Sequence, residues 1–396
     1  MSAPSGLPQS NGHVCGAGQD PSSPGQFVLV FQGGGALGAY QVGVYRAMHE
    51  AGIEPDWIIG TSIGAINAAL IAGNAPENRL AALDTFWKRV EKDRSWHNWL
   101  PTPQLTQSAS FMNTVMSGIP GFFEPNFQVL FGQQVPQNAE QAGYYSTAPL
   151  EKTLSDLVDF SLIAKKKPRL TVGAAHVCSS RMTYFDSREM ELGVKHIMAS
   201  GALPPAFPPV RIDGELYWDG GILSNTPVEA VFDDHDRRNS VIFAVHVWNP
   251  NGPEPRTMWE VTHRLKDVQY SSRVATHIAR QVETHRLRHA IAELVEQMPE
   301  QLRQSSAVKE LAGFGCLTRM HVVRLLAPQL DHEDQTKDVD FSPEGIAQRR
   351  EAGYVDAKAA IKLAPWTGDF ATHEGVLLHE AAPGGWKFGQ LQPKPD

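Results

Sequence analysis

The fold is decided by two short stretches, FVLVFQGGG at residues 27–35 and WIIGTSIG at residues 57–64. In both, a run of β-branched, leucine and aromatic residues leads into glycine, which is typical of a strand buried on both faces and followed by a tight turn. Residues 39–51 then have helical spacing and stop at Gly52, whereas residues 63–72 are mostly small or apolar and predict a helix buried on nearly all sides. This alternation predicts an α/β fold with a mostly parallel central sheet.

The rest of the chain divides into parts with different patterns. Further strands are expected at residues 170–177, 241–248 and 322–326. We expect a disordered leader at 1–26, the α/β domain at 27–250, a C-terminal helical extension packed on this domain at 251–364, and a loosely ordered tail at 365–396. The leader is rich in Ser, Pro and Gly and has no apolar core, so it does not resemble a signal peptide. The tail lacks any periodicity.

The extension begins with an amphipathic helical pattern between residues 257 and 298. Its apolar stripe consists of Met258, Val261, Leu265, Val268, Ala275, Ile278 and Val282. A single helix of this length is unusual in a globular protein, so we expect a break near residues 283–287, where the stripe shifts phase. The stripe predicts packing on the α/β domain or on a partner subunit, so these C-terminal helices are also candidates for forming an oligomer.

The composition limits the partners and the compartment. A formal net charge of -8 and a pI near 6.0 lack the basic character of a nucleic-acid-binding protein, so no such partner is expected. The cysteines Cys15, Cys178 and Cys316 are far apart, which predicts neither a metal site nor a disulfide framework and fits a reducing compartment. No apolar run approaches the roughly 18 residues of a membrane-spanning helix. We therefore expect a cytoplasmic protein, with reversible peripheral contact with membranes still open.

The motif Gly60-Thr61-Ser62-Ile63-Gly64 is the first candidate catalytic element. A Gly-x-Ser-x-Gly motif alone is weak, but here the serine lies where a buried strand meets a helix of small residues, which is the setting of a nucleophile elbow. Gly60 and Gly64 are expected because a Cβ at either position would clash across the turn. The N-terminus of the following helix would favour negative charge developing at Ser62. We therefore predict that Ser62 is a nucleophile.

The glycine triplet Gly33-Gly34-Gly35 has two interpretations. Its unobstructed N–H groups can form an anion nest, which an acyl-transfer enzyme needs for the tetrahedral oxyanion. The same residues, with Gly38, match the Gly-x-Gly-x-x-Gly fingerprint of dinucleotide-binding proteins. That interpretation needs an acid at the end of the next strand, but this strand leads into Ser62 and the nearby Asp56 stands before it. Dinucleotide binding therefore remains a remote alternative.

A nucleophilic serine needs a base, and the chain has 15 histidines of which none lies in a distinctive local setting. A stronger candidate is Asp219, where the aromatic run Tyr217-Trp218 meets the pair Gly220-Gly221. Asp-Gly sequences commonly form turns, so this pattern alone does not decide between a turn and a base. If Asp219 is the base, burial beside Trp218 is expected to raise its pKa above the usual 3.9 or so.

Taken together, four blocks resemble the patatin-like phospholipase family: the triplet at 33–35, the elbow at 60–64, ASGALPPAFPP at 199–209 and Asp-Gly-Gly at 219–221. The resemblance covers about residues 27–250 and implies a three-layer α/β/α fold. It also implies a Ser-Asp dyad without histidine, in which Ser62 is the nucleophile and Asp219 the base. Gly33, Gly34 and Gly35 would form the oxyanion loop, with Gly38, Gly220 and Gly221 supporting the motifs. Neither a cofactor nor a metal is implied.

The implied activity is hydrolysis of the carboxylic ester bonds of lipids, of the phospholipase A, lysophospholipase or esterase type. The same site would serve an esterase acting on hydroxyalkanoate oligomers or an acyltransferase, and a catalytically silent interaction protein is a further alternative. The C-terminal part is similar to an extension found in one bacterial branch of the family. One departure is Leu37, where many members carry Arg or Lys. Without that cation, oxyanion stabilisation would depend on backbone N–H groups and the helix dipole.

Residues 111–131 have a different sequence pattern, in which aromatic residues and Met are spaced by Gly and Pro without a regular period. One interpretation is a packed irregular insertion; the other is a lid or lipid-contacting surface over an apolar site. On the second interpretation, Phe122 and Phe123 would stand on a mobile tip.

Overall fold

The structure is a computed structural model. It describes residues 25–92, 111–128, 138–330, 333, 336–370, 374–382 and 385–388 of the chain. Residues 1–24 of the expected leader therefore lie outside the described residues, as do residues 129–131 of the insertion. Strand β1 begins at Gln26, beside the position where the sequence predicts order to begin.

Within these residues, ten strands form one mixed, mostly parallel sheet in the order β12-β11-β10-β9-β1-β2-β5-β8-β7, with β6 paired to β5 off this path. The strands are β1 (Gln26–Phe31), β2 (Trp57–Thr61), β5 (Arg169–His176), β6 (Met182–Asp186), β7 (Val210–Ile212), β8 (Glu215–Asp219), β9 (Ser240–His246), β10 (Met320–Leu326), β11 (Val376–Ala382) and β12 (Gly385–Phe388). Strands β5 and β8 run antiparallel, with Ala174 opposite Asp219. This pairing brings the carboxyl end of β8 close to the carboxyl end of the parallel strand β2, which pairs with β5.

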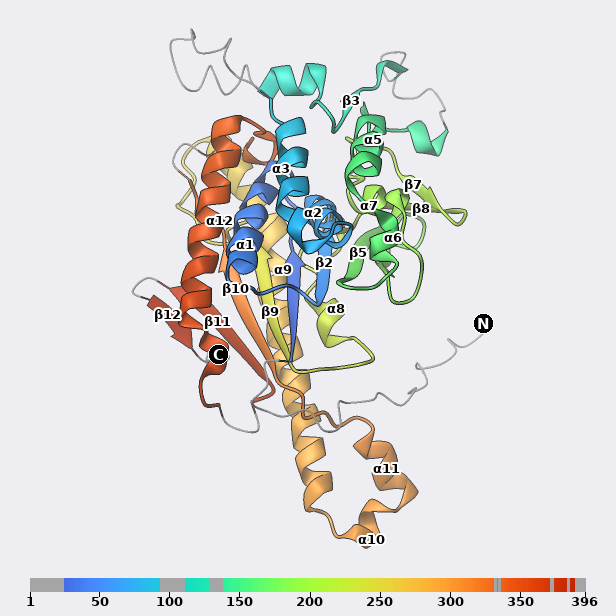
Figure 1. Ribbon diagram of the computed structural model, residues 1–396, viewed down its shortest axis with the longest axis vertical. Coiled ribbons are helices and arrows are strands. Elements are labelled where there is room, and N and C mark those ends of the chain that lie inside the picture. Colours follow the sequence, from blue (N-terminus) through green and yellow to red (C-terminus); the bar gives the residue numbers. More distant parts are fainter. Residues whose placement is uncertain are drawn as a thin grey trace.

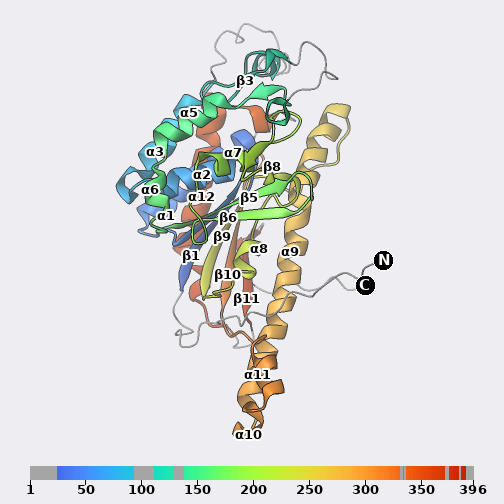
Figure 2. The same cartoon turned by 90° about the vertical axis from the view of Figure 1, so that its right-hand side faces the viewer.

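Helices cover both faces of the sheet and complete a three-layer α/β/α fold, as predicted (Figures 1 and 2). One face carries α1 (Ala39–Glu50), α2 (Ile63–Ala72), α3 (Arg79–Arg89) and α12 (Pro343–Leu363), and the other carries α8 (Glu229–Phe232) and α9 (Met258–Gln297). Alternate residues of β1 belong to different cores: Leu29 and Phe31 pack toward α1 and α2, whereas Val28 and Val30 pack toward α8 and α9. This division follows from the alternation of side chains along a strand.

The remaining elements lie around this framework. They are the helices α5 (Ala148–Leu157), α6 (Phe160–Ile163), α7 (Val194–Ser200), α10 (Glu300–Arg303) and α11 (Ser306–Ala312), the small hairpin β3 (Glu124–Pro125) and β4 (Tyr145–Ser146), and a helical stretch at 111–117. The far end of α9 projects beyond the sheet with α10 and α11 as an arm (Figures 1 and 2).

Helix α12 of the C-terminal extension packs directly on α1. A Cβ at Gly43 of α1 would lie 1.8 Å from the carbonyl oxygen of Arg350, and a Cβ at Gly353 of α12 would lie 2.0 Å from that of Tyr40. The two helix backbones can approach this closely only because both positions are glycine. The extension is therefore closely packed on the α/β domain.

The expectation of a loosely ordered tail from residue 365 is wrong for residues 376–382 and 385–388. Strand β11 pairs in parallel with β10, and β12 pairs with β11, so this segment extends the central sheet. Val376, Leu377 and Leu378 are buried. Their burial depends on pairing with a strand 56 residues earlier, which the local sequence pattern does not reveal.

The expected break near residues 283–287 is also wrong, because α9 is one continuous helix of 40 residues. The helix buries Asp267, Ser271, Ile278, Val282, His285 and His289, which follow one face at helical spacing. Several of these residues are polar and have partners in the fold. The positions of the apolar residues alone therefore do not identify the buried face of α9. The first part of the predicted stripe is solvent-exposed: Met258 and Leu265 are 78% and 61% exposed.

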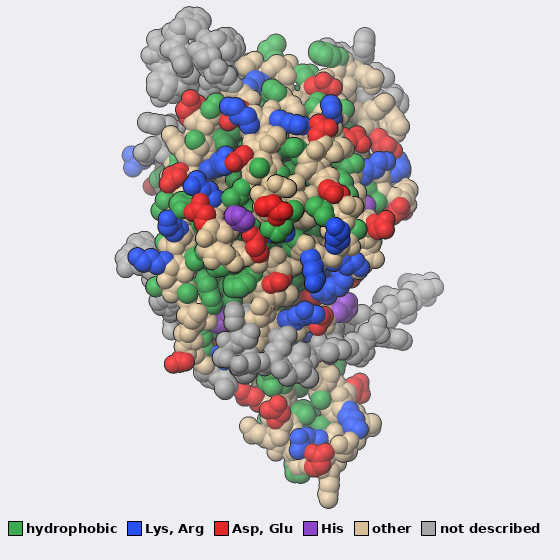
Figure 3. Space-filling view, viewed as in Figure 1, with side chains coloured by type: hydrophobic (Ala, Val, Ile, Leu, Met, Phe, Trp, Pro, Cys, Tyr) green, Lys and Arg blue, Asp and Glu red, His purple; other side chains and the backbone are tan. Residues whose placement is uncertain are grey.

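On the face shown in Figure 3, basic and acidic side chains are interspersed rather than segregated. A polyanion would therefore meet repulsion as well as attraction on this face. Within the described ranges, none of the helices combines the length and apolar character needed to cross a bilayer.

Candidate active site

Ser62 stands at the sharp turn between β2 and α2. Its backbone has φ 56° and ψ −127°, a conformation that is strained for a residue with a side chain. A Cβ at Gly60 would lie 2.3 Å from the carbonyl oxygen of Gly64, and a Cβ at Gly64 would lie 2.5 Å from that of Phe31. Both flanking positions therefore require glycine. At Gly60 the clash would lie across the turn, as expected from the sequence, whereas at Gly64 it would be with the end of β1.

The turn is held in place by Ser200 at the end of α7. The Ser62 N–H donates to the carbonyl oxygen of Ser200 at 3.1 Å and to its hydroxyl oxygen at 3.0 Å. The buried Ser200 hydroxyl in turn donates to the carbonyl oxygen of Gly173 in β5, at 2.6 Å. In the sequence, Ser200 is notable only as part of the block at 199–209. Its position directly before Gly201 gives no local sign of this contact.

Asp219 ends β8 and is 2% exposed. Burial raises the pKa of its carboxyl group to about 6, while hydrogen bonding with the Ser62 hydroxyl and with the Gly221 N–H acts in the opposite direction. The Gly221 N–H donates to Asp219 Oδ1 at 2.7 Å. The structure thus brings together the two residues of the predicted dyad, with the carboxyl group in an environment that makes it a stronger base.

The expected cause of that pKa rise is only partly right. Burial is the cause, but Trp218 precedes Asp219 in β8, so its side chain points to the opposite face of the strand. Asp219 lines an apolar cavity together with residues such as Leu203 and Phe207.

The glycine triplet lies beside Ser62, but its three members differ. The Gly33 N–H donates to the carbonyl oxygen of Asn225 at 3.1 Å, and the Gly33 carbonyl accepts from Trp248 Nε1 at 2.8 Å. Gly33 is therefore occupied as a donor, which removes it from the expected set of oxyanion donors. The N–H groups of Gly34 and Gly35 have no acceptor among the described residues. These two groups remain as candidate donors to an oxyanion.

The other glycines of the motifs are required by close contacts. A Cβ at Gly38 would lie 2.6 Å from Ile63, and one at Gly220 would lie 2.4 Å from the carbonyl oxygen of Gly173. A Cβ at Gly221 would lie 2.8 Å from the Asn225 side chain. These glycines allow the elbow, the β5 strand and the Asp219 turn to meet at one point.

A cavity of about 180 Å³ opens onto Ser62, Asp219 and the glycine triplet. Its walls are mainly apolar and include Ile63, Ile66, Phe111, Val115, Phe122, Phe123, Leu203, Phe207, Trp248 and Phe341. No histidine of the described residues lines it. An apolar chain bound here would place a carbonyl group near the nucleophile.

Phe122 and Phe123 form a wall of this cavity and do not stand on a mobile tip. They are 9% and 7% exposed, and the Phe122 ring contacts Phe86, Phe207 and Phe341. The prediction of an exposed tip is therefore wrong for these residues, which belong to a packed insertion. The exposed apolar groups of this segment are Phe127, which is 70% exposed, and the side chains of Phe111, Met112, Val115 and Met116 on the helical stretch 111–117.

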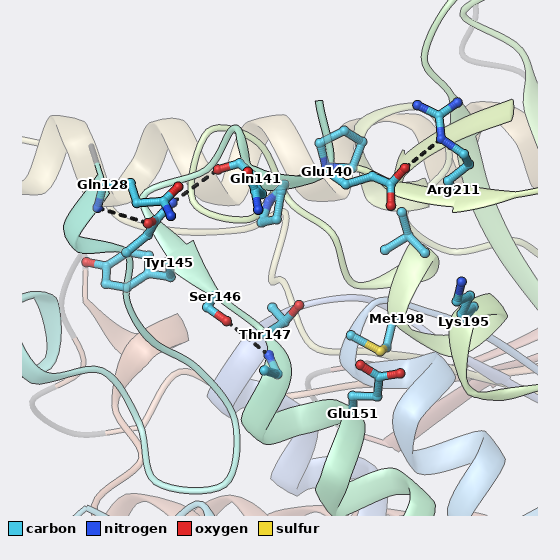
Figure 4. Close-up of a pocket in the computed structure, with 15 residues that line it drawn as sticks. Gln128, Glu140, Gln141, Tyr145, Ser146, Thr147, Glu151, Lys195, Met198 and Arg211 are labelled. Atoms are coloured by element: carbon cyan, nitrogen blue, oxygen red, sulfur yellow. Dashed lines mark hydrogen bonds and ion pairs between the residues drawn. The ribbon is translucent and has the colours of Figure 1, made fainter. Parts of the chain in front are cut away.

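A second cavity of about 370 Å³ is also lined by Tyr145 (Figure 4). Its lining is mixed polar and apolar and includes Glu151, Lys195 and the ion pair between Arg211 and Glu140, whose N–O distance is 2.6 Å. Tyr145 lines both cavities. Ser62 and Asp219 line only the smaller, apolar one, which is therefore the candidate active site.

The dinucleotide interpretation of the glycines finds no support in this geometry. Strand β2 ends at Thr61 without an acid, and Asp56 lies at its opposite end, where its carboxylate accepts from the Phe27 N–H at 2.8 Å. Among the described residues, no group of three or more His, Cys, Asp or Glu side chains is arranged to hold a metal ion.

Comparison with known protein families agrees with the geometry. The model of the patatin-like phospholipase family matches residues 29–232, which is more than half of the chain. The chain belongs to the patatin-like phospholipase family. Ser62 and Asp219 both lie within the matched region. A second family model, DUF3734, described as patatin phospholipase, matches residues 268–373, so the C-terminal extension is also associated with patatins.

Individual relatives are more distant. The patatin-like chain is 28% identical over 264 residues to the lysophospholipase nte1 of Aspergillus terreus, which covers 60% of this chain and 14% of the relative. It is 26% identical over 201 residues to the human patatin-like phospholipase domain-containing protein 6, covering 51% of this chain and 12% of the relative. The chain thus spans about a seventh or less of these relatives. Among solved structures, VipD from Legionella pneumophila aligns with a TM-score of 0.36 at 15% identity, over 86% of this chain and 67% of that one.

Proposed function

We propose that this chain hydrolyses carboxylic ester bonds of lipids through a Ser62-Asp219 dyad and an acyl-enzyme intermediate. The observation that carries the proposal is the pairing of a strained, accessible serine with a buried carboxyl group at the end of an apolar cavity. The lysophospholipase and phospholipase names of the relatives fit the same substrate class.

In the acylation step, the Asp219 carboxylate accepts the proton of the Ser62 hydroxyl as Oγ attacks the ester carbonyl carbon. The negative charge that develops on the carbonyl oxygen is stabilised by the N–H groups of Gly34 and Gly35 and by the N-terminus of α2. When the tetrahedral intermediate collapses, the ester C–O bond breaks. The leaving alcohol takes the proton from Asp219, and the acyl group remains on Ser62.

Deacylation repeats these steps with water. Asp219, again a carboxylate, accepts a proton from water as the water oxygen attacks the acyl carbonyl carbon. The second intermediate collapses with Ser62 as the leaving group, and Ser62 recovers its proton from Asp219. The products are a free carboxylic acid and the original enzyme. A hydroxyalkanoate oligomer would follow the same route, and an acyltransferase would replace water by a second alcohol.

We also propose reversible contact with a lipid surface at the cavity entrance. Phe111 and Val115 line the cavity and are 38% and 39% exposed, while Met112 and Met116 on the same helical stretch are 55% and 72% exposed. Residues 111–123 contain no charged side chain. Such a rim can enter the interfacial region of a bilayer without desolvating a charge. Assembly through the C-terminal helices stays a prediction.

The proposal is tested by labelling with a fluorophosphonate probe, which reacts with activated serines. The full chain should be labelled and should release fatty acid from phospholipid or lysophospholipid micelles, and Ser62→Ala should lose both properties while keeping its fold. Labelling of Ser62→Ala at the wild-type rate would show that another residue is the nucleophile. Labelling without release of fatty acid from any lipid, but with transfer to an added alcohol, would favour the acyltransferase.

A further inference from the structure

The C-terminal extension contributes a wall of the candidate active site. Tyr270, Asp338, Val339 and Phe341 all line the cavity that contains Ser62, although they lie beyond the region matched by the catalytic family model. No motif in the sequence of this part of the chain indicates a chemical role. Its position beside the glycine triplet raises the question of what it does there.

The closest approach is between two backbones. The short helical turn η7 (Lys337–Val339) lies against the turn η1 (Gly35–Gly38), and a Cβ at Gly35 would lie 2.2 Å from the carbonyl oxygen of Asp338. Gly35 also has a φ of 55°, in the region that favours glycine. A shift of η7 would therefore be transmitted directly to the backbone that presents the Gly34 and Gly35 N–H groups.

The η7 turn is itself fixed by two ion pairs to α9. Lys337 Nζ lies 2.7 Å from Asp267 Oδ1, and these side chains are only 3% and 1% exposed. The neighbouring Lys266 pairs with Asp338, also at 2.7 Å but with greater exposure. Removing one partner of the buried pair would leave an uncompensated charge, so the buried pair is the stronger constraint on the turn.

The other side of the glycine triplet is held through Trp248. The Trp248 indole donates to the Gly33 carbonyl oxygen, and its ring stacks on Tyr270 with centroids 5.0 Å apart. Lys337 Nζ lies 5.3 Å from the centroid of the same ring. The Gln32 side chain donates to the Tyr270 carbonyl oxygen at 3.2 Å and accepts from the Trp248 N–H at 3.0 Å.

We infer that the extension is part of the catalytic apparatus: the buried Lys337-Asp267 ion pair and the Tyr270-Trp248 stack hold the Gly33–Gly35 loop in the position that binds the oxyanion. Lys337 and Asp267 are thus positioning residues, which act on the reaction through the loop. The binding of an oxyanion by this loop rests on the proposed function. The fixing of the loop by the extension does not rest on it and can be measured independently.

The test compares Lys337→Met with Arg324→Met in the full chain. Arg324 of β10 pairs with Glu380 of β11 at 2.6 Å, and neither residue lines the cavity. For each variant, kcat and KM are measured on a short p-nitrophenyl ester, and amide hydrogen exchange is measured over residues 32–38.

We expect Lys337→Met to lower kcat about tenfold or more with KM within about twofold, because transition-state stabilisation is lost. The hydrogen-bonded amides of Gly33 and Leu37 should exchange about tenfold faster. Arg324→Met should change neither.

If Lys337→Met does not fold, the double variant Lys337→Met/Asp267→Leu removes both buried charges and serves in its place. Wild-type exchange and wild-type kcat in a folded variant would overturn the inference, as would equal effects in Arg324→Met. A wild-type chain without Ser62-dependent ester hydrolysis would instead refute the proposed function. In that case the exchange measurement alone decides whether the extension fixes the loop.

Discussion

The N–H of Ser62 donates to both oxygens of Ser200, so the strained elbow is fixed by a residue 138 positions away. The Ser200 hydroxyl also donates to Gly173, which links the elbow, α7 and β5 through one buried side chain. Backbone strain of this kind persists only where the surrounding contacts determine it. Ser200 is therefore expected to keep the Ser62 hydroxyl directed toward Asp219.

Ser200→Ala should lower kcat on a soluble ester by about tenfold, with little change in KM, because the nucleophile is less well positioned while the cavity is intact. The carbonyl oxygen of Ser200 still accepts from Ser62, so the elbow should loosen without unfolding. Steady-state kinetics together with the melting temperature separates the two effects. Unchanged kcat in a folded variant would show that the carbonyl contact alone positions the nucleophile.

Activity should depend on pH through the Asp219 carboxyl group, whose pKa is raised to about 6 by burial. The base must be deprotonated, so kcat/KM should be constant above pH 7 and fall about tenfold for each pH unit below the pKa. The measurement is a pH-rate profile on a neutral ester between pH 4.5 and 8, over the range in which the protein remains folded. A profile that stays flat down to pH 4.5 would argue against a base in this environment.

The same burial of the Asp219 carboxyl group should lower the free energy of unfolding. A carboxyl group whose pKa rises from 3.8 to about 6 on folding favours the protonated form in the native state. The resulting decrease in the free energy of unfolding is absent below pH 3.8 and grows as the pH rises toward 6. Above that pH it stays constant at up to about 3 kcal/mol. Asp219→Asn should therefore nearly abolish activity and yet unfold at a higher denaturant concentration at pH 7.5 than the wild type. The gain should disappear near pH 4, and a destabilised variant at both pH values would contradict this account.

The sequence predicted the central layers and the position of Ser62 at an elbow because the signals for both are local. The apolar runs of β1 and β2 identify buried strands, and the clash that a Cβ at Gly60 would make with the Gly64 carbonyl oxygen lies within the elbow itself. Asp219 was a candidate from its place before Gly220-Gly221, but only the family resemblance favoured a base, because an Asp-Gly pair is equally typical of a turn.

The features that the sequence did not predict depend on pairs that are distant along the chain. Lys337 and Asp267 are 70 positions apart, and each taken alone looks like an ordinary surface charge. The occupied Gly33 donor depends on Asn225 in the same way. Polar residues such as Asp267 and His285 continue the buried face of α9, so a pattern based on apolar residues predicts a break that does not exist.

The helical stretch 111–117 provides the last prediction, because its exposed methionines can be separated from the buried phenylalanines of the same insertion. Met112 and Met116 are exposed and do not line the cavity, whereas Phe122 is buried in its aromatic wall. The double variant Met112→Ser/Met116→Ser should keep its melting temperature and its rate on a soluble short-chain ester. Its rate on phosphatidylcholine vesicles should fall severalfold, since each buried methionine contributes apolar area to membrane binding. Phe122→Ser is the matched comparison: it should lower both rates and the melting temperature together, as expected of a core residue. If the methionine variant retains full activity and full binding on vesicles, the helical stretch is not the surface that meets the lipid.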